Sequence, residues 1–383
     1  MDTNDLKTKN SMINIGITGQ TGFIGTHLYN FLNLLKNDVQ LVPFEDRFFS
    51  DQNDLESFVS KCDAIVHLAA LNRHNDPQTI YDTNIGLVKQ LISALENTGS
   101  RPHILFSSST QEERDNVFGK SKRVGRQLLR SWAERSGALF TGMVIPNVFG
   151  PFGNPYYNSV VATFSHQLTH GEQPRMETDA QLKLIYIGDL VSVIWYLIKN
   201  RVSDGEYKIS PTDEAKVTEI LTLLQSFKDQ YMDNGIVPNL SDPFERNLFN
   251  TFVCYIDHSI FFPYKLKLNT DERGSFVETV KLNSGGQISF STTKPGVTRG
   301  NHFHTRKAER FAVIKGRARI QLRRIGTDKV INFDLDGAEP SFVDMPVWHT
   351  HNITNTGSED LYTIFWISEF FNPGDPDTFF EKV

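Results

Sequence analysis

The sequence predicts an α/β domain with a doubly wound parallel sheet, followed by an all-β domain of the jelly-roll barrel type. Residues 13–35 read as an apolar strand, a glycine-rich turn and an amphipathic helix. Strands and helices then alternate as far as residue 224, which favours a parallel sheet. From residue 266 onward short strands alternate with turns about every 8 to 12 residues, a pattern typical of antiparallel sandwiches and barrels.

Length and composition limit the possible partners and compartment. The chain has 383 residues and a net charge of −6, so we expect no nucleic-acid partner. Cys62 and Cys254 are far apart in sequence, which argues against a disulfide framework and favours a reducing compartment. No apolar run reaches the ~18 residues of a membrane span, and the N-terminus lacks a signal-peptide core. We therefore expect a cytoplasmic protein without membrane contact.

The predicted domain boundaries follow breaks in the pattern. Residues 1–11 are polar and without periodicity, so we expect a disordered tail. Prolines interrupt an irregular, aromatic stretch between residues 234 and 263. We place the boundary there, with a nucleotide-binding domain at 12–245 and a barrel domain at 246–383.

The glycine-rich turn is the first candidate site. Gly19, Gly22 and Gly25 are spaced by two residues, with Phe23 and Ile24 between the last two. Glycines at these places allow the turn, the approach of backbone N–H groups to a pyrophosphate, and close packing of helix on strand. A turn without a ligand is the alternative interpretation, because one glycine-rich turn is weak evidence.

The ends of the next two strands bear on cofactor choice. Residues 39–42 form a predicted strand that ends near Glu45, Asp46 and Arg47. An acid at this place favours NAD and an arginine favours the 2′-phosphate of NADP, and we favour NADPH through Arg47. The next strand, 64–67, runs into small residues, and Ala69 there suits a close approach of the cofactor.

Together these motifs resemble the extended short-chain dehydrogenases/reductases, a family with a Rossmann-like fold. The resemblance implies a Tyr-x-x-x-Lys pair on a helix, in which the phenol protonates the substrate carbonyl and the lysine holds the ribose. Lys122 matches the lysine, and Ser109 matches the hydroxyl that orients the carbonyl. Phe118 stands at the tyrosine position, and the chain has no tyrosine between Tyr81 and Tyr156.

Phe118 leaves three interpretations open. The phenylalanine can be an engineered replacement that silences the enzyme, or a natural variant in which water or Ser109 supplies the proton. Alternatively, the domain only binds nucleotide. The same resemblance implies that Asn147, in Pro-Asn-Val-Phe-Gly-Pro, contacts the sugar nucleotide or the cofactor, although this pair can also simply shape a turn. Asp189 is expected to cap a helix.

A histidine-rich pattern in the barrel domain predicts a metal site. His302 and His304 are two residues apart on a predicted strand and therefore share a face. Glu309 and His351 follow at the spacing of the two cupin motifs, which this region resembles. Three imidazoles and a carboxylate suit Zn²⁺, with Fe, Ni or Mn as other possibilities. His349 is a spare histidine that could act as a base in the same cavity.

Two further stretches resemble the dTDP-4-dehydrorhamnose 3,5-epimerases. They are Asp-Glu-Arg-Gly-Ser-Phe around Arg273 and Gly-Val-Thr-Arg-Gly-Asn-His around Arg299. The resemblance implies that both arginines bind the substrate diphosphate. It also implies removal of a proton next to a sugar ketone, with His302 as ligand, base or both.

Over nearly its whole length the chain resembles the bifunctional capsular-polysaccharide enzymes of the CapF type. The segment Phe-Asn-Pro-Gly-Asp-Pro-Asp-Thr-Phe-Phe, residues 371–380, is part of this resemblance. It implies a homodimer in which the barrel domain epimerises C3 of a UDP-linked 4-keto-6-deoxy-N-acetylhexosamine. NADPH then reduces C4 to give UDP-N-acetyl-6-deoxy-L-talosamine. The rival hypotheses are a nucleotide-sensing, metal-binding protein without catalysis, and a reductase with an inactive barrel domain.

Overall fold

The computed structural model describes residues 12–272 and 274–383, which pack into two compact units. One unit runs to Phe149 and includes Leu182–Glu214, and the other comprises Gly150–Gln181 and Ala215–Val383. The predicted fold class is confirmed, because a parallel sheet with helices precedes an antiparallel all-β region. The boundary at residue 245, between a nucleotide-binding domain and a barrel domain, stays a prediction. The predicted tail, 1–11, and Arg273 lie outside the described residues.

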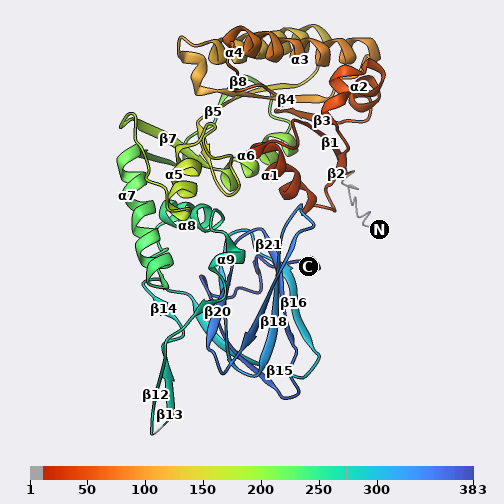
Figure 1. Ribbon diagram of the computed structural model, residues 1–383. Coiled ribbons are helices and arrows are strands. Elements are labelled where there is room, and N and C mark those ends of the chain that lie inside the picture. The colour runs from red at the N-terminus through yellow and green to blue at the C-terminus, as the bar shows by residue number, and fades with distance from the viewer. Residues whose placement is uncertain (1–11, 273) are drawn as a thin grey trace, which may run out of the picture. The chain divides into compact units, whose positions relative to one another are not determined.

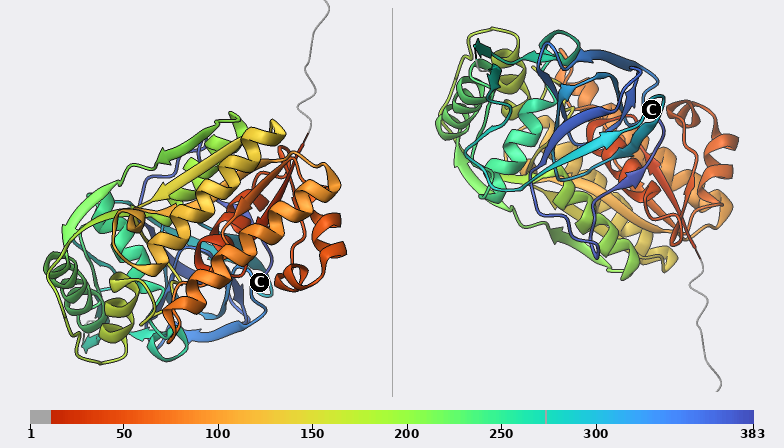
Figure 2. Two further views of the ribbon diagram at one scale, coloured as in Figure 1. Left: turned by 90° about the horizontal axis from the view of Figure 1, so that it is seen from above. Right: turned by 90° about the horizontal axis from the view of Figure 1, so that it is seen from below.

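The first unit is built on a six-stranded sheet in the order β2-β1-β3-β4-β5-β8, and all its pairings are parallel. Helices α3 and α4 cover one face, and α1 and α6 the other (Figure 1); α3 and α4 lie side by side in the left view of Figure 2. The elements are β1 Ile13–Thr18, α1 Phe23–Asn33, β2 Val39–Val42, η1 Asp46–Ser50, α2 Gln52–Val59, β3 Ala64–His67, α3 Pro77–Thr98, β4 His103–Ser109, η2 Thr110–Glu113, α4 Val117–Ser136, β5 Phe140–Ile145, β6 Asn147–Phe149, β7 Gln181–Tyr186, α6 Ile187–Lys199, β8 Asp204–Lys208 and β9 Asp213–Lys216.

The strand order places a ligand crevice at the end of β1. The chain passes from β1 to β2 on one side and continues with β3 on the other side, so the order reverses between β1 and β3. Open α/β sheets bind ligands outside the carboxyl ends of the strands at such a reversal. The glycine turn follows β1 directly, and the small residues after β3 lie at the same edge.

Local sequence explains where the two long helices begin and end. Asp76 caps α3 by accepting a hydrogen bond from the N–H of Gln78, and Asn116 caps α4 by accepting one from Gly119. Gly99 and Gly137 end these helices in the left-handed conformation. Among the described helices, none combines the length and the apolar character needed to cross a membrane.

A large apolar core fixes these helices on the sheet. Buried side chains of α2, α3 and α4 pack against those of β3, β4 and β5. Trp132, which is 1% exposed, and Phe58, which is 2% exposed, are among the largest side chains in it. Truncating such a residue to alanine costs about 3–5 kcal/mol of unfolding free energy, so this core contributes strongly to the stability of the unit that carries the glycine turn.

The second unit joins a group of helices to two five-stranded antiparallel sheets. The sheet orders are β11-β20-β17-β22-β15 and β19-β18-β21-β16-β23 (Figure 1). Its elements are α5 Val160–Thr169, α7 Val217–Phe227, η3 Lys228–Asp233, β10 Ile236–Val237, α8 Pro243–Val253, α9 His258–Phe261, β11 Tyr264–Lys265, β12 Leu268–Asp271, β13 Gly274–Val277, β14 Lys281–Leu282, β15 Gln287–Thr293, β16 Thr298–Phe303, β17 Glu309–Lys315, β18 Arg317–Arg324, β19 Val330–Asp336, β20 Ser341–Met345, β21 His349–Asn355, β22 Leu361–Ile367 and β23 Phe379–Phe380.

Alternating side chains close the space between these two sheets. Ile320 and Leu322 of β18 point inward at a spacing of two and are fully buried, as are Val343 of β20 and Leu361 of β22. They form one apolar cluster contributed by both sheets. This cluster fills one part of the interior, and the histidines of β16 and β21 lie in another.

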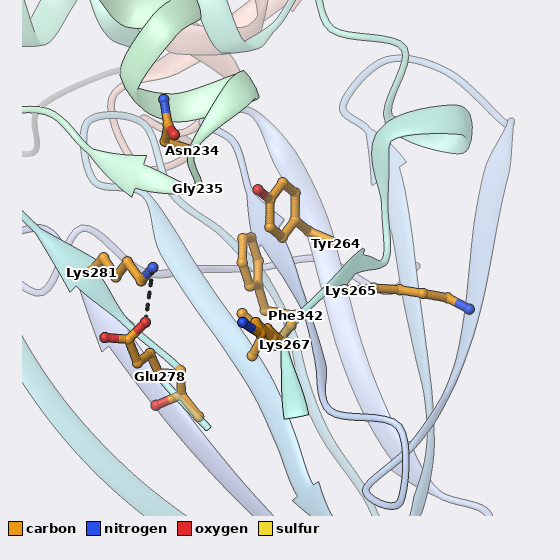
Figure 3. Close-up of a pocket in the computed structure, with 10 residues that line it drawn as sticks. Asn234, Gly235, Tyr264, Lys265, Lys267, Glu278, Lys281 and Phe342 are labelled. Atoms are coloured by element: carbon orange, nitrogen blue, oxygen red, sulfur yellow. Dashed lines mark ion pairs between the residues drawn. The ribbon is translucent and has the colours of Figure 1, made fainter. Parts of the chain in front are cut away.

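A pocket in the second unit is lined by none of the predicted site residues that the structure describes. It is lined by Asn234, Gly235, Tyr264, Lys265, Leu266, Lys267, Glu278, Thr279, Lys281 and Phe342. Figure 3 shows the ion pair between Lys281 and Glu278 on one side of it. The rings of Tyr264 and Phe342 stack with centroids 5.0 Å apart. Its charged lining is partly neutralised by this ion pair, and it holds no histidine or cysteine.

Candidate active sites

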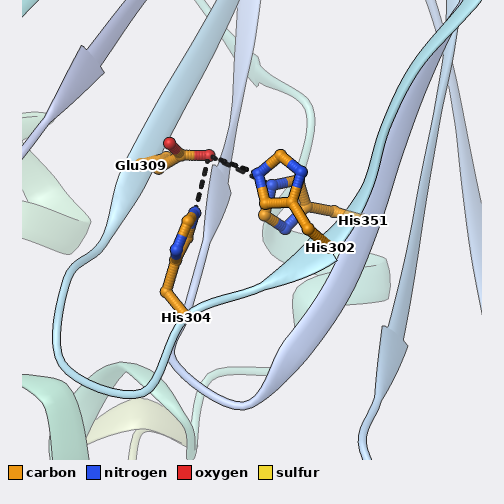
Figure 4. A group of neighbouring side chains, drawn as sticks. All are labelled: His302, His304, Glu309 and His351. Carbon is orange, nitrogen blue, oxygen red and sulfur yellow. Dashed lines mark hydrogen bonds and ion pairs between the residues drawn. The ribbon is translucent and has the colours of Figure 1, made fainter. Parts of the chain in front are cut away.

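Four side chains from both antiparallel sheets converge in the second unit. His302 lies in β16, His304 directly follows it, Glu309 begins β17, and His351 lies in β21 (Figure 4). His302 and His351 are register partners in neighbouring strands, so their side chains share a face. A bulge between Gly300 and His302 turns the end of β16, as bulges beside functional sites commonly do.

The four groups are close enough to bind one ion. One ligand atom from each residue lies within 4.8 Å of the ligand atoms of the other three. The Nε2 atoms of His351, His304 and His302 are 3.0, 3.3 and 3.8 Å from one carboxylate oxygen of Glu309. His351 is fully buried and His304 nearly so, whereas the His302 side chain is 24% exposed. The structure thus brings together all four predicted metal ligands.

Backbone carbonyls fix the tautomers of two of these histidines. His304 Nδ1 lies at hydrogen-bond distance from the carbonyl oxygen of Asp377, and His351 Nδ1 lies 3.2 Å from that of His349. A carbonyl can only accept, so each Nδ1 carries the proton and donates it. This leaves Nε2 of each ring facing the Glu309 carboxylate, where it could bind a cation held between them.

Burial and charge support the same conclusion. His304 Nε2 is buried without a hydrogen-bond partner among the described residues. Burial alone would raise the pKa of Glu309, but the three surrounding histidines hold that pKa well below its usual value. Burial lowers the pKa of His351, which favours the neutral, ligating imidazole. The residues present therefore fit a divalent transition metal, and imidazoles with one carboxylate are a set that suits zinc.

His349 has a different environment from the one we expected. Its ring packs against His258 and Phe152, and its Nδ1 donates to the carbonyl of Val347. Burial lowers the pKa of His349 to about 3. The expectation that it is a base in the metal cavity is therefore wrong, because its environment is a packed aromatic cluster.

The glycine turn of the first unit has little room for side chains. Gly19 has φ +69°, and a Cβ on it would come within 2.7 Å of the backbone nitrogen of Ala69. A Cβ on Gly25 would overlap the carbonyl oxygen of Gly19. The amide of Ala69 also donates to Thr18 Oγ1, which holds the two strand ends together. Phe23 and Ile24 begin α1, so the backbone N–H groups of its first turn are near the turn.

Lys122 is buried in the first unit, close to the position that lacks a phenol. Its Nζ is 5.6 Å from the ring centre of Phe118 and 3.5 Å from Ser107 Oγ. Burial lowers the pKa of Lys122 to about 8, although the carboxylate of Glu112 opposes this shift. The hydroxyl of Ser109 instead accepts a hydrogen bond from the N–H of Gln111. Ser107 thus contacts the amine, and its two-residue offset from Ser109 on β4 could have indicated it.

The remaining predicted binding residues are dispersed. Arg47 forms ion pairs of 2.8 Å with Glu45 and 2.5 Å with Asp54 at the surface. Asn147 is exposed and donates to the carbonyl of Lys183. Arg299 is exposed on β16 and donates to the carbonyl of Thr292. Arg273 is outside the described residues.

The prediction that Asp189 caps a helix is wrong. The cap position of α6 belongs to Tyr186, and Asp189 lies within the first turn of the helix. An acidic residue there still interacts favourably with the positive end of the helix dipole.

Comparison with known proteins finds two family models along the chain. Residues 15–210 match the NAD dependent epimerase/dehydratase family, and residues 269–379 match the polysaccharide biosynthesis C-terminal domain. A UDP-2-acetamido-2,6-beta-L-arabino-hexul-4-ose reductase of Pseudomonas aeruginosa is 32% identical over 366 residues, which are 95% of this chain and 97% of that protein.

Solved structures are similar over the same length. The crystal structure of the capsular polysaccharide assembling protein CapF from Staphylococcus aureus is 35% identical, covers 97% of this chain and 100% of its own, and has a TM-score of 0.61. A structure of CapF with the inhibitor 3-isopropenyl-tropolone has the same coverage, 33% identity and a TM-score of 0.58.

Proposed function

Because this chain belongs to the NAD-dependent epimerase/dehydratase family, in its CapF-like branch, we propose a bifunctional nucleotide-sugar enzyme of capsular or surface polysaccharide biosynthesis. The all-β region is the metal-dependent epimerase, a cupin, and acts on C3 of a UDP-2-acetamido-2,6-dideoxy-4-hexulose. The Rossmann-like domain reduces C4 with NADPH and forms UDP-2-acetamido-2,6-dideoxy-L-talose. The converging His302, His304, Glu309 and His351 are the single observation that carries this proposal.

In the epimerase, we assign different roles to the residues of the histidine cluster. A divalent ion held by the four side chains would polarise the C4 carbonyl and thereby acidify the C3 proton. His304 and His351 are buried and have tautomers fixed by carbonyls, so they serve as ligands. His302 is the most exposed of the four and is our candidate for ligand and base, removing the C3 proton to leave an enediolate. A solvent proton then adds to C3 from the opposite face of the enediolate and inverts C3, and the proton held by the base returns to solvent. Arg299 and Arg273 are our candidates for binding the diphosphate.

In the reductase, the chain holds the dinucleotide and orients the ketone. The turn formed by Gly19, Gly22 and Gly25, with the start of α1 at Phe23 and Ile24, offers N–H groups to the pyrophosphate. Lys122 holds the nicotinamide ribose, Ala69 allows the cofactor to approach, and Arg47 meets the 2′-phosphate. Bound NADPH supplies the hydride to C4. Ser109 orients the carbonyl and Asn147 the sugar nucleotide, but Phe118 cannot donate a proton to the developing alkoxide.

Proton exchange at C3 tests the proposal. The 4-keto sugar nucleotide is incubated in deuterated water with protein and without NADPH, and the C3 proton is followed by NMR. We expect its signal to disappear, and the C4 ketone to be consumed only after NADPH is added. Absence of exchange by metal-loaded protein would refute the epimerase assignment. The epimerase acts first, because reduction of C4 removes the ketone that acidifies C3.

Phe118 favours a second candidate function. Without a phenol beside Lys122, the Rossmann-like domain can bind a dinucleotide without reducing a sugar, and the protein would then be a nucleotide sensor that binds metal. The same NMR experiment separates the two functions. A sensor binds NADPH, exchanges no C3 proton and consumes no ketone.

We further propose a cytoplasmic homodimer. Ile288 and Phe290 are 57% and 73% exposed on β15, an edge strand, and an apolar edge of this kind suits pairing with a second copy. Light scattering of the wild-type chain should give twice its mass of 43.6 kDa. The variant Phe290→Lys should shift that mass toward the monomer if β15 forms the interface.

A further inference from the structure

The segment Glu369–Phe380, here called the strap, lies against the loop that carries two of the metal-binding residues. This loop, residues 304–308, connects β16 to β17 and so joins His304 to Glu309. At the far end of the strap, β23 pairs with β16, with Phe380 opposite His302 and Phe379 opposite Phe303. The strap therefore contacts the chain on both sides of His304.

Charged groups fasten the strap to the loop. Arg306 forms ion pairs of 3.1 Å with Glu369 and 2.9 Å with Asp375, and Lys307 Nζ donates to the carbonyl oxygen of Pro376 at 2.7 Å. Lys307 is only 3% exposed, although lysines are rarely buried. This contact is thus part of a packed interface between loop and strap.

Asp377 is the centre of this interface. One of its carboxylate oxygens accepts from the N–H and the hydroxyl of Thr305 at 3.0 and 2.7 Å. The other accepts from the N–H groups of Arg306 and Lys307 at 3.1 and 3.2 Å. Asp377 is 3% exposed, and its φ of +41° is a left-handed conformation that few residues other than glycine adopt. A carboxylate with this many donors holds its own backbone in one place.

The same residue touches the metal cluster through its backbone. The carbonyl oxygen of Asp377 accepts the Nδ1–H of His304, and the carbonyl oxygen of His304 accepts a hydrogen bond of 2.7 Å from the N–H of Trp348. His304 is thereby held at the ring and at the backbone. The position of the Asp377 carbonyl decides the direction in which His304 Nε2 points.

We propose that Asp377 is a positioning residue for the metal site: its carboxylate locks loop 304–308, so that its carbonyl fixes the tautomer and orientation of His304. This inference rests on the proposed metal site and adds a residue outside the four ligands. Partners that orient a ligating histidine commonly change metal affinity by about 10- to 100-fold when they are removed. We expect a loss of this size here.

Three variants test the inference by metal affinity. Asp377→Gly keeps the left-handed backbone and removes the carboxylate, whereas Asp377→Asn keeps one acceptor oxygen and tolerates the same conformation. The matched control is Asp375→Asn, which alters the same strap at an exposed acid whose ion pair with Arg306 does not reach His304. Affinity for Zn²⁺ is measured by competition with a chelator, and the visible spectrum of bound Co²⁺ reports the ligand geometry.

We expect Asp377→Gly to weaken Zn²⁺ binding by about 10- to 100-fold and to alter the Co²⁺ spectrum, Asp377→Asn to lose less, and Asp375→Asn to match the wild type. Wild-type affinity in Asp377→Gly would overturn the inference, as would an equal loss in the Asp375 control. If Asp377→Gly does not fold, a Zn²⁺ affinity of Asp377→Asn equal to that of the wild type would overturn the inference. If the wild-type chain binds no metal, the proposed metal site itself is refuted. This result can be told apart from a failure of the Asp377 inference, because it is seen in the wild type alone.

Discussion

The histidine cluster of the all-β region and the Lys122 region of the Rossmann-like unit differ in completeness. Three imidazoles and a carboxylate face one another in the cluster, with two tautomers already fixed by carbonyls. Around Lys122 the glycine turn, the buried amine and the capped start of α4 are formed, but Phe118 lacks the proton-donating hydroxyl.

The difference shows what a fold can reveal about activity. A proposed metal site leaves a physical trace, because three imidazoles and a buried carboxylate converge within 4.8 Å of one another. A missing phenol leaves none: Asn116 still caps α4, and Lys122 still packs near an aromatic ring. The chain therefore keeps the fold of a reductase whether or not it reduces quickly, and only chemistry can separate the two cases.

Removing a ligand should have the largest effect. In His351→Ala the cluster loses its most buried imidazole, so metal content and C3 exchange should both fall to background. Metal analysis and NMR in deuterated water measure these two quantities. NADPH binding should be unchanged, because the glycine turn belongs to the other unit. Exchange that survives in metal-free protein would remove the cluster from the reaction.

Restoring the phenol should have the next largest effect. The variant Phe118→Tyr places a hydroxyl beside Lys122, and a single general acid contributes about 10²- to 10⁴-fold to a rate. Oxidation of NADPH in the presence of the 4-keto sugar nucleotide should rise by that factor, while C3 exchange stays constant. If the wild-type chain already turns over several times per second and tyrosine gives no gain, another group protonates the alkoxide.

Most of the fold was predictable because its signals are local. Glycine spacing, the apolar strands β1 and β3, and the alternation of β17 to β22 follow from short stretches of sequence. The cluster that we propose as the metal site was predictable for the same reason, since His302 and His304 are two residues apart and the resemblance to the cupin motifs supplies the other two. The structure confirms that all four converge.

The roles of Asp377 and His349 depend on tertiary contacts and could not be predicted from the sequence. Nothing local reveals that Asp377 reaches across 73 positions to His304, although the Asn-Pro-Gly-Asp-Pro-Asp stretch marks a tight turn. His349 shares a strand with His351, but its partners His258 and Phe152 come from distant segments. Trp348 stands where cupin motifs usually have glycine, and it adopts φ +60° there. This left-handed conformation is one that glycine adopts more readily than tryptophan.

The buried amine of Lys122 should make stability depend on pH. Burial lowers the pKa of Lys122 from 10.5 to about 8, so between these values the unfolded chain binds more protons than the folded chain. The free energy of unfolding should therefore rise across this window, by up to about 3 kcal/mol from this residue. Urea titrations of wild type and Lys122→Met at pH 7 and pH 10 measure it. A difference between the two proteins that does not change with pH would contradict the buried charge.

The glycines of the turn should tolerate substitution unequally. A Cβ on Gly25 would overlap the backbone oxygen of Gly19, whereas a Cβ on Gly22 would lie 3.2 Å from the same atom. Gly25→Ala should therefore cost about 1–3 kcal/mol of unfolding free energy and lose NADPH binding, and Gly22→Ala should cost less. Urea unfolding and fluorescence titration measure both effects. Equal losses would show that the crowding at Gly25 relaxes without cost.

Arg47 should give the smallest effect, because its present partners compete with the cofactor. If it binds the 2′-phosphate, the chain should prefer NADPH over NADH by about tenfold, and Arg47→Ala should abolish that preference. The guanidinium must then leave its ion pairs with Glu45 and Asp54, so Glu45→Gln should strengthen NADPH binding slightly and leave NADH binding unchanged. Titrations with both dinucleotides at low and high salt test this, since an exposed charge pair is screened by salt. Equal affinity of the wild-type chain for the two cofactors would exclude Arg47 from the site. In that case we expect Glu45 or Asp46, which follow β2, to bind the unphosphorylated ribose of NADH.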